Sequence, residues 1–162
     1  MSAVTAFLGL GANLQDPAAQ VRRALEELAG IPQSRVLSHS PLYMSPPLGP
    51  SDQPDYVNAV AALETHLDPF LLLGELRALE TRHGRQRDGS RWGPRTLDLD
   101  ILLYGDRVLD TPELTLPHPG LHERAFVLYP LSDVAPQLQI PGRGSVRGLR
   151  ERLGAVRIQR LD

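Results

Sequence analysis

The chain repeats one plan twice: a short apolar segment, then an Asp-Pro pair, then a stripe of apolar residues at helical spacing. Val4 to Leu10 is followed by Asp16-Pro17, and Tyr56 to Leu63 is followed by Asp68-Pro69. Aspartate is a preferred helix N-cap and proline is favoured at the first helical position, so each pair predicts the start of a helix. A strand before each helix predicts a mixed fold in which helices pack on a sheet.

The apolar stripes show which side of each helix is buried. The residues that share one helix face are Val21, Leu25 and Leu28 in the first helix and Leu72, Leu76 and Leu79 in the second. Gly30 and Gly84 follow the stripes, where a helix stop is expected. The segments Arg35 to Tyr43 and Leu97 to Tyr104 predict two further strands.

The predicted elements follow in the order β-α-β-β-α-β, which is the order of the ferredoxin-like plan. We therefore expect an α+β fold with a ferredoxin-like core and with the helices packed on one face of the sheet. A chain of 162 residues has the length of one domain, so residues 1–162 are assigned to a single domain. After Gly105 we expect an irregular C-terminal extension with short helices at Gly120 to Arg124 and Val146 to Leu153.

The charged residues exclude several kinds of protein. All 17 basic side chains are arginine, cysteine is absent, and the net charge is −2. Such a chain is not a strongly basic nucleic-acid binder, and it has neither a P-loop lysine nor a Schiff-base lysine. It also has no disulfide framework and no thiolate metal site. Any phosphate chemistry must therefore use arginine, metal ions or backbone N–H groups.

The sequence also predicts a location. No apolar run approaches the roughly 20 residues that a membrane helix needs. The start, Met1-Ser2-Ala3-Val4, lacks the basic residues of a signal peptide. We therefore expect a cytoplasmic protein.

Two aspartates on one predicted strand form the strongest local signal. Side chains alternate along a strand, so Asp98 and Asp100 point to one face, whereas Leu97, Leu99 and Ile101 point to the helices. Two carboxylates at this spacing, about 7 Å between Cα atoms, can converge on magnesium. The strand taken alone is equally consistent with a solvated face, and only its surroundings decide between the two interpretations.

The preceding segment, Arg85 to Thr96, favours phosphate chemistry. It carries Arg85, Arg87, Arg91 and Arg95 together with Trp92. Guanidinium groups bind phosphate oxygens in pairs of hydrogen bonds, and a cluster of them repels itself until an anion gathers it. Arginine for phosphate beside aspartate for magnesium is what a nucleoside triphosphate needs. A charged loop with one structural tryptophan is the simpler alternative.

A proline-rich segment precedes a second candidate site. Tyr56 and Asn58 share one face of the third predicted strand, which follows prolines at positions 46, 47, 50 and 54. An aromatic plane beside a carboxamide suits a flat heterocycle with donor and acceptor edges. An ordinary Tyr–Asn pair at a strand start would give the same pattern.

Further along the chain, His118 lies between two prolines, and its ring could donate to phosphate or cap a turn.

These motifs together resemble one enzyme family, 6-hydroxymethyl-7,8-dihydropterin pyrophosphokinase of folate biosynthesis. The segments that carry the resemblance are Leu8 to Leu14, Pro46 to Pro50, Gln53 to Ala59, Gly84-Arg85, Arg91 to Ile101 and Pro117-His118. Arg-Trp-Gly-Pro-Arg-Thr-Leu-Asp-Leu-Asp is the most specific of them, and the resemblance covers almost the whole chain. It implies transfer of pyrophosphate from ATP to the pterin hydroxymethyl group, with release of AMP.

The resemblance also implies roles for individual residues. Asp98 and Asp100 would hold two magnesium ions, and Arg85 and Arg95 would lie nearest the transferring phosphates. The other residues implied to bind ATP are Glu80, Arg87, Arg91, Trp92, Ile101, Thr115, His118 and Arg124. Those implied to bind the pterin are Ser45, Pro46, Leu48, Tyr56, Asn58 and Phe126. We expect a monomer that uses these two substrates and binds neither nucleic acid nor a membrane.

Three positions depart from the best-known members of that family. Arg77 stands where they have a glutamine near the adenine, Glu113 where they have an arginine near ATP, and Pro119 where they have an aromatic residue. These changes affect single adenine and phosphate contacts and leave the aspartate pair and the pterin residues in place.

Two other functions would explain parts of the sequence. A ferredoxin-like sheet can stack single-stranded RNA on residues such as Tyr56 and Trp92, but the RNA-binding motif is missing and Asp98 and Asp100 would repel phosphate without metal. A nucleotidyl transferase or cyclase would explain the aspartates but not the Pro46 to Asn58 segment. AMP as a product supports pyrophosphoryl transfer, whereas release of pyrophosphate supports a nucleotidyl transferase.

Overall fold

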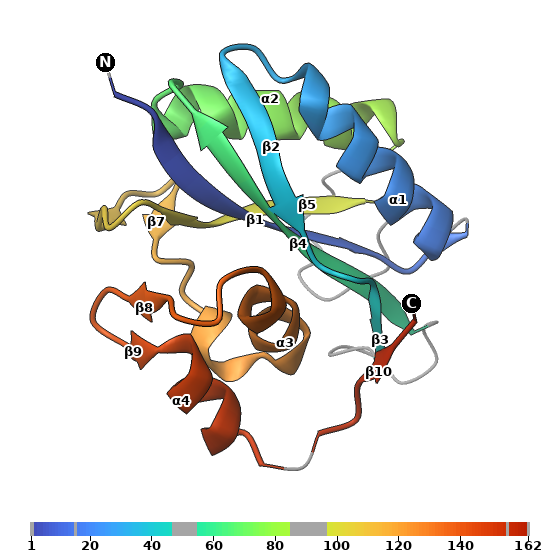
Figure 1. Cartoon of the computed structure of the whole chain (residues 1–162). Helices are drawn as coiled ribbons and strands as arrows, with labels where there is room; N and C mark the ends of the chain where they lie inside the picture. Colours follow the sequence, from blue (N-terminus) through green and yellow to red (C-terminus); the bar gives the residue numbers. More distant parts are fainter. Residues whose placement is uncertain (1, 15, 47–54, 85–96, 155, 162) are drawn as a thin grey trace.

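The computed structural model describes residues 2–14, 16–46, 55–84, 97–154 and 156–161, which form a main sheet with helices on both faces and two small two-stranded sheets (Figure 1). The strands are β1 Val4–Ala12, β2 Ser34–His39, β3 Tyr43–Ser45, β4 Tyr56–Thr65, β5 Asp98–Tyr104, β6 Leu109–Asp110, β7 Thr115–Leu116, β8 Gln139–Ile140, β9 Gly144–Ser145 and β10 Gln159–Arg160. The helices are α1 Pro17–Glu27, α2 Pro69–Arg82, α3 Ala125–Val134 and α4 Val146–Arg152, with short 3-10 turns at Leu28–Gly30 and Leu121–Glu123. The predicted α+β fold class is confirmed.

The main sheet has the strand order β10-β3-β4-β1-β5, and β2 also pairs with β4. Every pairing in it is antiparallel. Strand β1 is central, because β4 runs along one side of it from Val4 to Ala12 and β5 along the other. Strand β5 lies at the end of this order, with β1 as its neighbour in the sheet.

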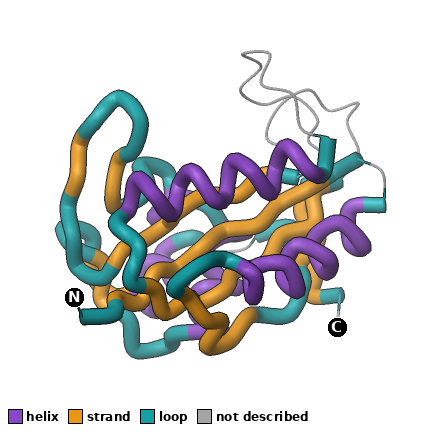
Figure 2. Tube along the Cα trace, turned by 90° about the horizontal axis from the view of Figure 1, so that it is seen from above, coloured by secondary structure: helices purple, strands orange, loops and turns teal. Residues whose placement is uncertain are grey.

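Helices α1 and α2 cover one face of the sheet, as the apolar stripes predict, and Figure 2 shows them from above. Both predicted caps form. The carboxylate of Asp68 accepts the backbone N–H groups of Phe70 and Leu71 at 2.9 and 3.0 Å, and that of Asp16 accepts the N–H of Ala19. The six stripe residues are all buried in a core shared with β1, β4 and β5. The start and buried face of each helix are therefore explained by local sequence.

The predicted strand Arg35 to Tyr43 is wrong in one respect, because it is two strands. The chain leaves the ladder at Ser40-Pro41, since proline has no N–H to donate. Ser40 keeps the break attached to the sheet. Its N–H donates to the carbonyl of Val60 at 2.8 Å, and its hydroxyl accepts the N–H of Val60 at 3.0 Å. Strand β3 then resumes pairing with β4, beginning with Tyr43 opposite Asn58.

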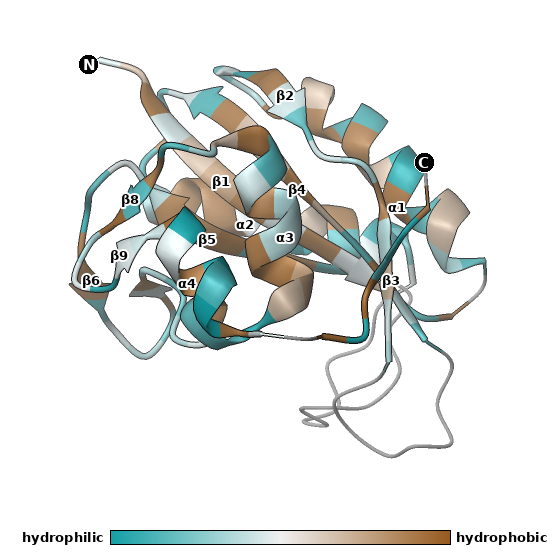
Figure 3. Ribbon diagram, turned by 60° about the horizontal axis from the view of Figure 1, so that its bottom comes forward, coloured by the Kyte–Doolittle hydropathy of each residue, from teal (hydrophilic) through white to brown (hydrophobic). Residues whose placement is uncertain are grey.

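The expectation that helices pack on only one face of the sheet is also wrong. Helices α3 and α4 lie on the face opposite α1 and α2 (Figure 1). The side chains of Val127, Leu128 and Leu131 on α3 form a second core with sheet residues such as Phe7 and Leu102. Figure 3 shows hydrophobic colouring on the central strands and hydrophilic colouring on α4, the outer element of this layer. The segment after Gly105 is thus more regular than predicted.

No helix in the part of the chain that the structure describes has the length and apolar character needed to cross a bilayer.

Candidate active site

The second face of the sheet carries a pocket that α3 and α4 leave uncovered. It encloses about 760 Å³, counting the solvent at its open mouth. It is lined by Gly9, Leu10, Gly11, Ser45, Pro46, Tyr56, Asn58, Val60, Asp98, Asp100, Leu102, His118, Arg124, Phe126 and Val127. Its floor comes from β1, β4 and β5, and its walls come from β3 and from the segment that leads into α3. A few polar groups above an apolar floor are typical of a small-molecule site.

Two glycines on the central strand create the floor. Gly9 and Gly11 lie on the pocket side of β1, whereas the alternate residues Leu8 and Leu10 are buried in the core under α1 and α2. Gly11 pairs with Asn58 of β4 on one side and with Asp98 of β5 on the other. Since Gly9 and Gly11 have no side chains, the floor is a trough between the carboxamide of Asn58 and the carboxylates of Asp98 and Asp100.

Asn58 lies against this trough and depends on it. The side chain is 7% exposed, and its carbonyl oxygen accepts the hydroxyl of Ser45 at 3.3 Å. A Cβ atom built on Gly11 would stand 2.7 Å from Nδ2 of Asn58, closer than real Cβ contacts allow. Glycine at position 11 is therefore what allows the carboxamide to lie across the strand.

Asp98 and Asp100 both line the pocket, on the face that strand alternation predicts. Their neighbours Leu97, Leu99 and Ile101 are buried in the core on the opposite side of the strand. Both carboxylates are partly exposed, so they face the pocket rather than the protein interior. The predicted two-sided character of β5 is confirmed.

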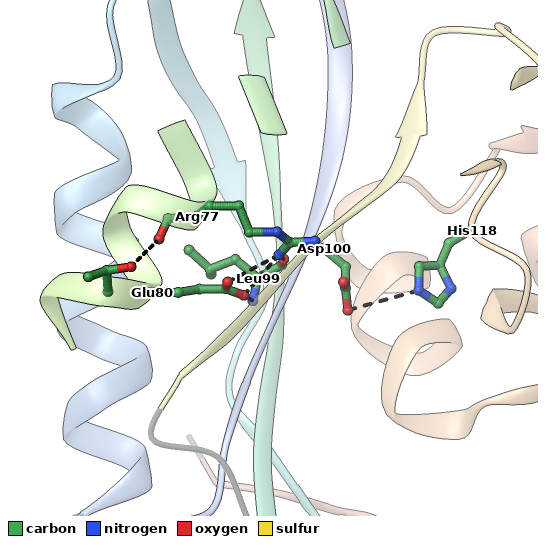
Figure 4. A network of polar contacts seen from close by, with 6 residues as sticks. Arg77, Glu80, Leu99, Asp100 and His118 are labelled. Atoms are coloured by element: carbon green, nitrogen blue, oxygen red, sulfur yellow. Dashed lines mark hydrogen bonds and ion pairs between the residues drawn. The ribbon is translucent and has the colours of Figure 1, made fainter. Parts of the chain in front are cut away.

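His118 faces Asp100 from the wall of the pocket (Figure 4). Its Nε2 lies 3.9 Å from a carboxylate oxygen of Asp100, which is too long for a hydrogen bond. Its Nδ1 accepts the backbone N–H of Gly120 at 3.2 Å, so in the neutral ring the proton is on Nε2. Burial and the nearby Arg124 lower the pKa of His118 from 6.5 to about 4, although Asp98 opposes this change. At neutral pH His118 thus presents an uncharged N–H donor.

Arg124 places a positive charge at the same wall. Its guanidinium carbon is 5.8 Å from the centre of the Phe126 ring, within cation–π range. Its head group also packs on Gly120, where an added Cβ would stand 2.6 Å from the guanidinium carbon. Gly120 therefore leaves the space that this arginine occupies.

Nine of the predicted site residues meet in this pocket: Asp98, Asp100, His118, Arg124, Ser45, Pro46, Tyr56, Asn58 and Phe126. They come from the end of β3, from β4, from β5, and from residues 118–126, which lead into α3; these segments are far apart in the sequence. The structure does not test the predicted roles of Leu48, Arg85, Arg87, Arg91, Trp92 and Arg95, which lie outside the described residues.

Three residues expected to bind ATP do not line the pocket. The Glu80 side chain is buried under the sheet, where its carboxylate accepts the backbone N–H of Leu99 at 2.8 Å and pairs with Arg77 at 3.1 Å. The Ile101 side chain is in the helix-side core, because strand alternation turns it away from the aspartates. Thr115 is half-buried on β7, which packs against β5 beside the pocket. For Glu80 and Ile101, the side chain is on the wrong face for a pocket contact.

The aspartate pair fits a magnesium ion that is bound together with substrate phosphates. Within the described ranges, no group of three or more His, Cys, Asp or Glu side chains is arranged to hold a metal ion. Magnesium is normally bound by one or two carboxylates together with substrate phosphates rather than by an all-protein cage. Two partly exposed carboxylates on one strand face match that description.

A comparison with known families shows to which family the chain belongs. The model of the family described as 7,8-dihydro-6-hydroxymethylpterin-pyrophosphokinase (HPPK) matches residues 7–136. The chain belongs to the HPPK family. The match includes β1, β4, β5 and the start of α3, so it contains every described element that contributes to the pocket.

Two relatives with the same name have similar sequences. The chain is 54% identical over 135 residues to the 2-amino-4-hydroxy-6-hydroxymethyldihydropteridine pyrophosphokinase of Pseudomonas aeruginosa, covering 83% of each chain. It is 48% identical over 138 residues to the protein of that name from Haemophilus influenzae, covering 85% of this chain and 86% of the relative.

Solved structures support the fold. The chain matches a Plasmodium falciparum HPPK-DHPS structure with pteroate at a TM-score of 0.73 and 15% identity, covering 93% of this HPPK chain. A second structure, described as HPPK-DHPS in complex with substrates, matches at a TM-score of 0.72 and 11% identity over 94% of the chain. The chain spans less than half of either solved chain, 42% and 43% respectively.

The glycines of the trough were not identified as functional from the sequence. Gly9 and Gly11 alternate with Leu8 and Leu10, so one face of the predicted strand is apolar and the other has no side chains. That alternation was the available signal, because glycine inside a strand marks a place where something approaches the backbone closely.

We predict that Gly11→Ala damages the pocket, because the new methyl group would push away the buried Asn58 carboxamide. Overpacking of this kind lowers the free energy of unfolding by about 1–3 kcal/mol. Gly74→Ala is the matched control, since nothing lies within 4 Å of a Cβ at this exposed helical position. Denaturant unfolding should show a loss for Gly11→Ala and a gain for Gly74→Ala. Equal effects would contradict this role of Gly11.

Proposed function

We propose that this protein transfers pyrophosphate from ATP to the hydroxymethyl group of 6-hydroxymethyl-7,8-dihydropterin and releases AMP. The observation that carries the proposal is the trough. It sets the carboxamide of Asn58 opposite the carboxylates of Asp98 and Asp100 across the glycine floor of β1. One end suits a flat heterocycle and the other suits metal-bound phosphate. Membership of the HPPK family supports joining these two halves in one reaction.

The pterin is assigned to the end of the pocket that holds Tyr56, Asn58 and Phe126. The two aromatic rings line the same pocket as Asn58, so they can stack on a planar ring while the amide binds its edge. Ser45 fixes the amide through its hydrogen bond to the Asn58 carbonyl oxygen. That leaves the amide nitrogen as the group offered to a ligand acceptor.

The triphosphate is assigned to the end that holds the aspartates, His118 and Arg124. Asp98 and Asp100 would hold two magnesium ions, which supply charge neutralisation of the phosphates and orientation of the attacking oxygen. His118 offers an uncharged N–H donor, and Arg124 offers a cation. We also assign Arg85, Arg87, Arg91, Trp92 and Arg95 to the phosphate side, and any contact of Ile101 with the nucleotide to its backbone.

The reaction needs no covalent intermediate on the protein. The pterin hydroxyl oxygen forms a bond to the β-phosphorus, and the bond from that phosphorus to the oxygen bridging it to the α-phosphorus breaks. The hydroxyl proton passes to solvent, and AMP leaves with the bridging oxygen. Catalysis then consists of alignment of the two substrates and stabilisation of charge on the transferring group.

Three further assignments belong to the proposal. The strand order β3-β4-β1-β5 with its two crossover helices supports a ferredoxin-like plan for the core. We also propose that the chain is a single domain that works as a monomer, and that it acts in the cytoplasm.

Product analysis tests the reaction directly. The protein is incubated with ATP, magnesium and 6-hydroxymethyl-7,8-dihydropterin, and the nucleotides are separated by chromatography. We expect AMP to form in equal amount to the diphosphorylated pterin. Release of pyrophosphate instead would favour a nucleotidyl transferase, and the absence of any pterin-dependent product would rule out the proposed function.

We predict that Asp98→Asn and Asp100→Asn each lower turnover at least about a hundredfold, since each loses several kcal/mol of charge stabilisation. The fold should remain, because both side chains are partly exposed. Asp110→Asn is the matched control, an exposed aspartate on β6 outside the pocket. Turnover is measured with saturating magnesium, and melting temperature is measured alongside. Near-normal turnover of either variant would show that the carboxylate does not bind the metal.

We predict that Tyr56→Ala and Phe126→Ala weaken pterin binding more than ATP binding. Each removes a stacking surface worth about 1 kcal/mol or more, which is roughly fivefold in affinity. Phe70→Ala, which changes an exposed ring at the start of α2, should alter neither affinity. Calorimetric titration with each ligand gives both constants. Equal losses for the two ligands would mean that the rings support the fold rather than the pterin.

A further inference from the structure

Strand β5 carries the aspartates at the edge of the main sheet. It pairs with β1 alone among the strands of the main sheet, through Asp98 with Gly11, Leu99 with Leu10 and Asp100 with Gly9. Asp98 is also the first residue of the strand. An edge strand has backbone N–H and C=O groups without a strand partner, and its end is where pairing is weakest. Two like charges on one face add repulsion at this point.

Helix α2 supplies the missing partner at one residue of that edge. The carboxylate of Glu80 accepts the N–H of Leu99 at 2.8 Å, and Nη1 of Arg77 donates to the carbonyl of Leu99 at 3.0 Å (Figure 4). The same Arg77 nitrogen lies 3.1 Å from both carboxylate oxygens of Glu80. One donor and one acceptor, three residues apart on a helix, thus take the place of a neighbouring strand.

The carboxylate of the pair is buried to an unusual degree for a charged group. The Glu80 side chain is 2% exposed and that of Arg77 is 34% exposed. Glu80 is the one carboxylate among the buried polar residues of the described chain. Burying an ion pair costs desolvation free energy, and apolar side chains of similar size often serve stability equally well. The pair is therefore better explained by the backbone groups that it holds than by general stability.

What the pair fixes is the residue between the two aspartates. We propose that Glu80 and Arg77 are positioning residues, which hold both polar backbone groups of Leu99 and so set the spacing and direction of Asp98 and Asp100 toward a divalent cation. This inference rests on the proposed function, since it takes the aspartates as cation ligands. It differs from the role that family resemblance implies for Glu80, because the carboxylate acts on the strand and not on the nucleotide.

The proposal makes the cation site sensitive to a change on the opposite face of the sheet. Residues that orient metal ligands typically alter metal affinity by about ten- to a hundredfold when they are replaced. The pterin end should be unaffected, because Tyr56 and Asn58 lie on β4 and Phe126 lies at the start of α3. A loss confined to cation binding is what separates positioning from a general loss of structure.

Three variants test it. Glu80→Gln has nearly the same shape but places amide hydrogens against Arg77. The double variant Arg77→Gln with Glu80→Gln restores donor and acceptor complementarity without charge. Leu25→Ala is the control, since it removes an apolar side chain on α1 that is buried in the same core and has no hydrogen-bonding group.

Two measurements are made on each protein. Hydrogen exchange by NMR gives the protection of the Leu99 amide relative to other strand amides. Calorimetric titration with Mn²⁺, in the presence of a non-hydrolysable ATP analogue, gives the cation affinity without turnover. For Glu80→Gln we expect at least tenfold faster exchange at Leu99 and about tenfold weaker Mn²⁺ binding, with unchanged pterin affinity. The double variant should recover part of both losses, and Leu25→Ala should raise exchange throughout the sheet while keeping the Mn²⁺ affinity.

Other outcomes would overturn the proposal. Unchanged Mn²⁺ affinity in Glu80→Gln, or a loss matched by Leu25→Ala, would show that the pair only stabilises the fold. Either result leaves the proposed function standing. If the unsubstituted protein binds no Mn²⁺ with the ATP analogue, the proposed function fails and this inference fails with it.

Discussion

The backbone pairing of β1 with β4 and β5 is the interaction on which the rest of the structure depends. It joins three strands that are far apart in the sequence, and it sets Asn58 and Asp98 on either side of Gly11. The helix-side core uses the alternate residues of the same strands. One set of hydrogen bonds therefore defines both the hydrophobic core and the position of the polar groups in the pocket.

Strand β5 illustrates how stability and function share a short segment. Leu97, Leu99 and Ile101 are buried under α2, so the strand is held by apolar packing on one side. Asp98 and Asp100 can then occupy the other side although aspartate is disfavoured in strands. The unfavourable residues are tolerated because burial of their neighbours, together with the contacts of Glu80 and Arg77 to Leu99, holds the strand.

The sequence predicted what depends on local rules. Asp68 caps α2 as expected, and Asp98 and Asp100 share a face because strand alternation requires it. Helix α3 was missed because Pro130 lies inside it and no side chain caps its start. Its formation depends instead on burial of Val127 and Leu131 against the sheet, which is a tertiary effect.

The contact of Glu80 with Leu99 could not be predicted from the sequence, because it too depends on tertiary packing. Family resemblance placed Glu80 at the nucleotide, whereas the fold turns its carboxylate to the backbone of Leu99. No spacing rule connects a helix side chain to a backbone N–H nineteen residues later. Strand alternation brought Asp98 to Asp100 and Tyr56 to Asn58, but only the family resemblance joined these two pairs to the other residues of the pocket.

The glycine trough has a consequence for how the pocket can adapt. Side chains can change rotamer to fit a new ligand, but a floor made of main chain in a central strand cannot. The backbone at Gly9 and Gly11 is fixed by pairing on both sides, so the base of the pocket behaves as a rigid template. Plasticity is left to the rim, where Tyr56, Arg124 and Phe126 are only partly buried. A compound shaped to the floor would therefore meet the same surface in every conformer of the rim.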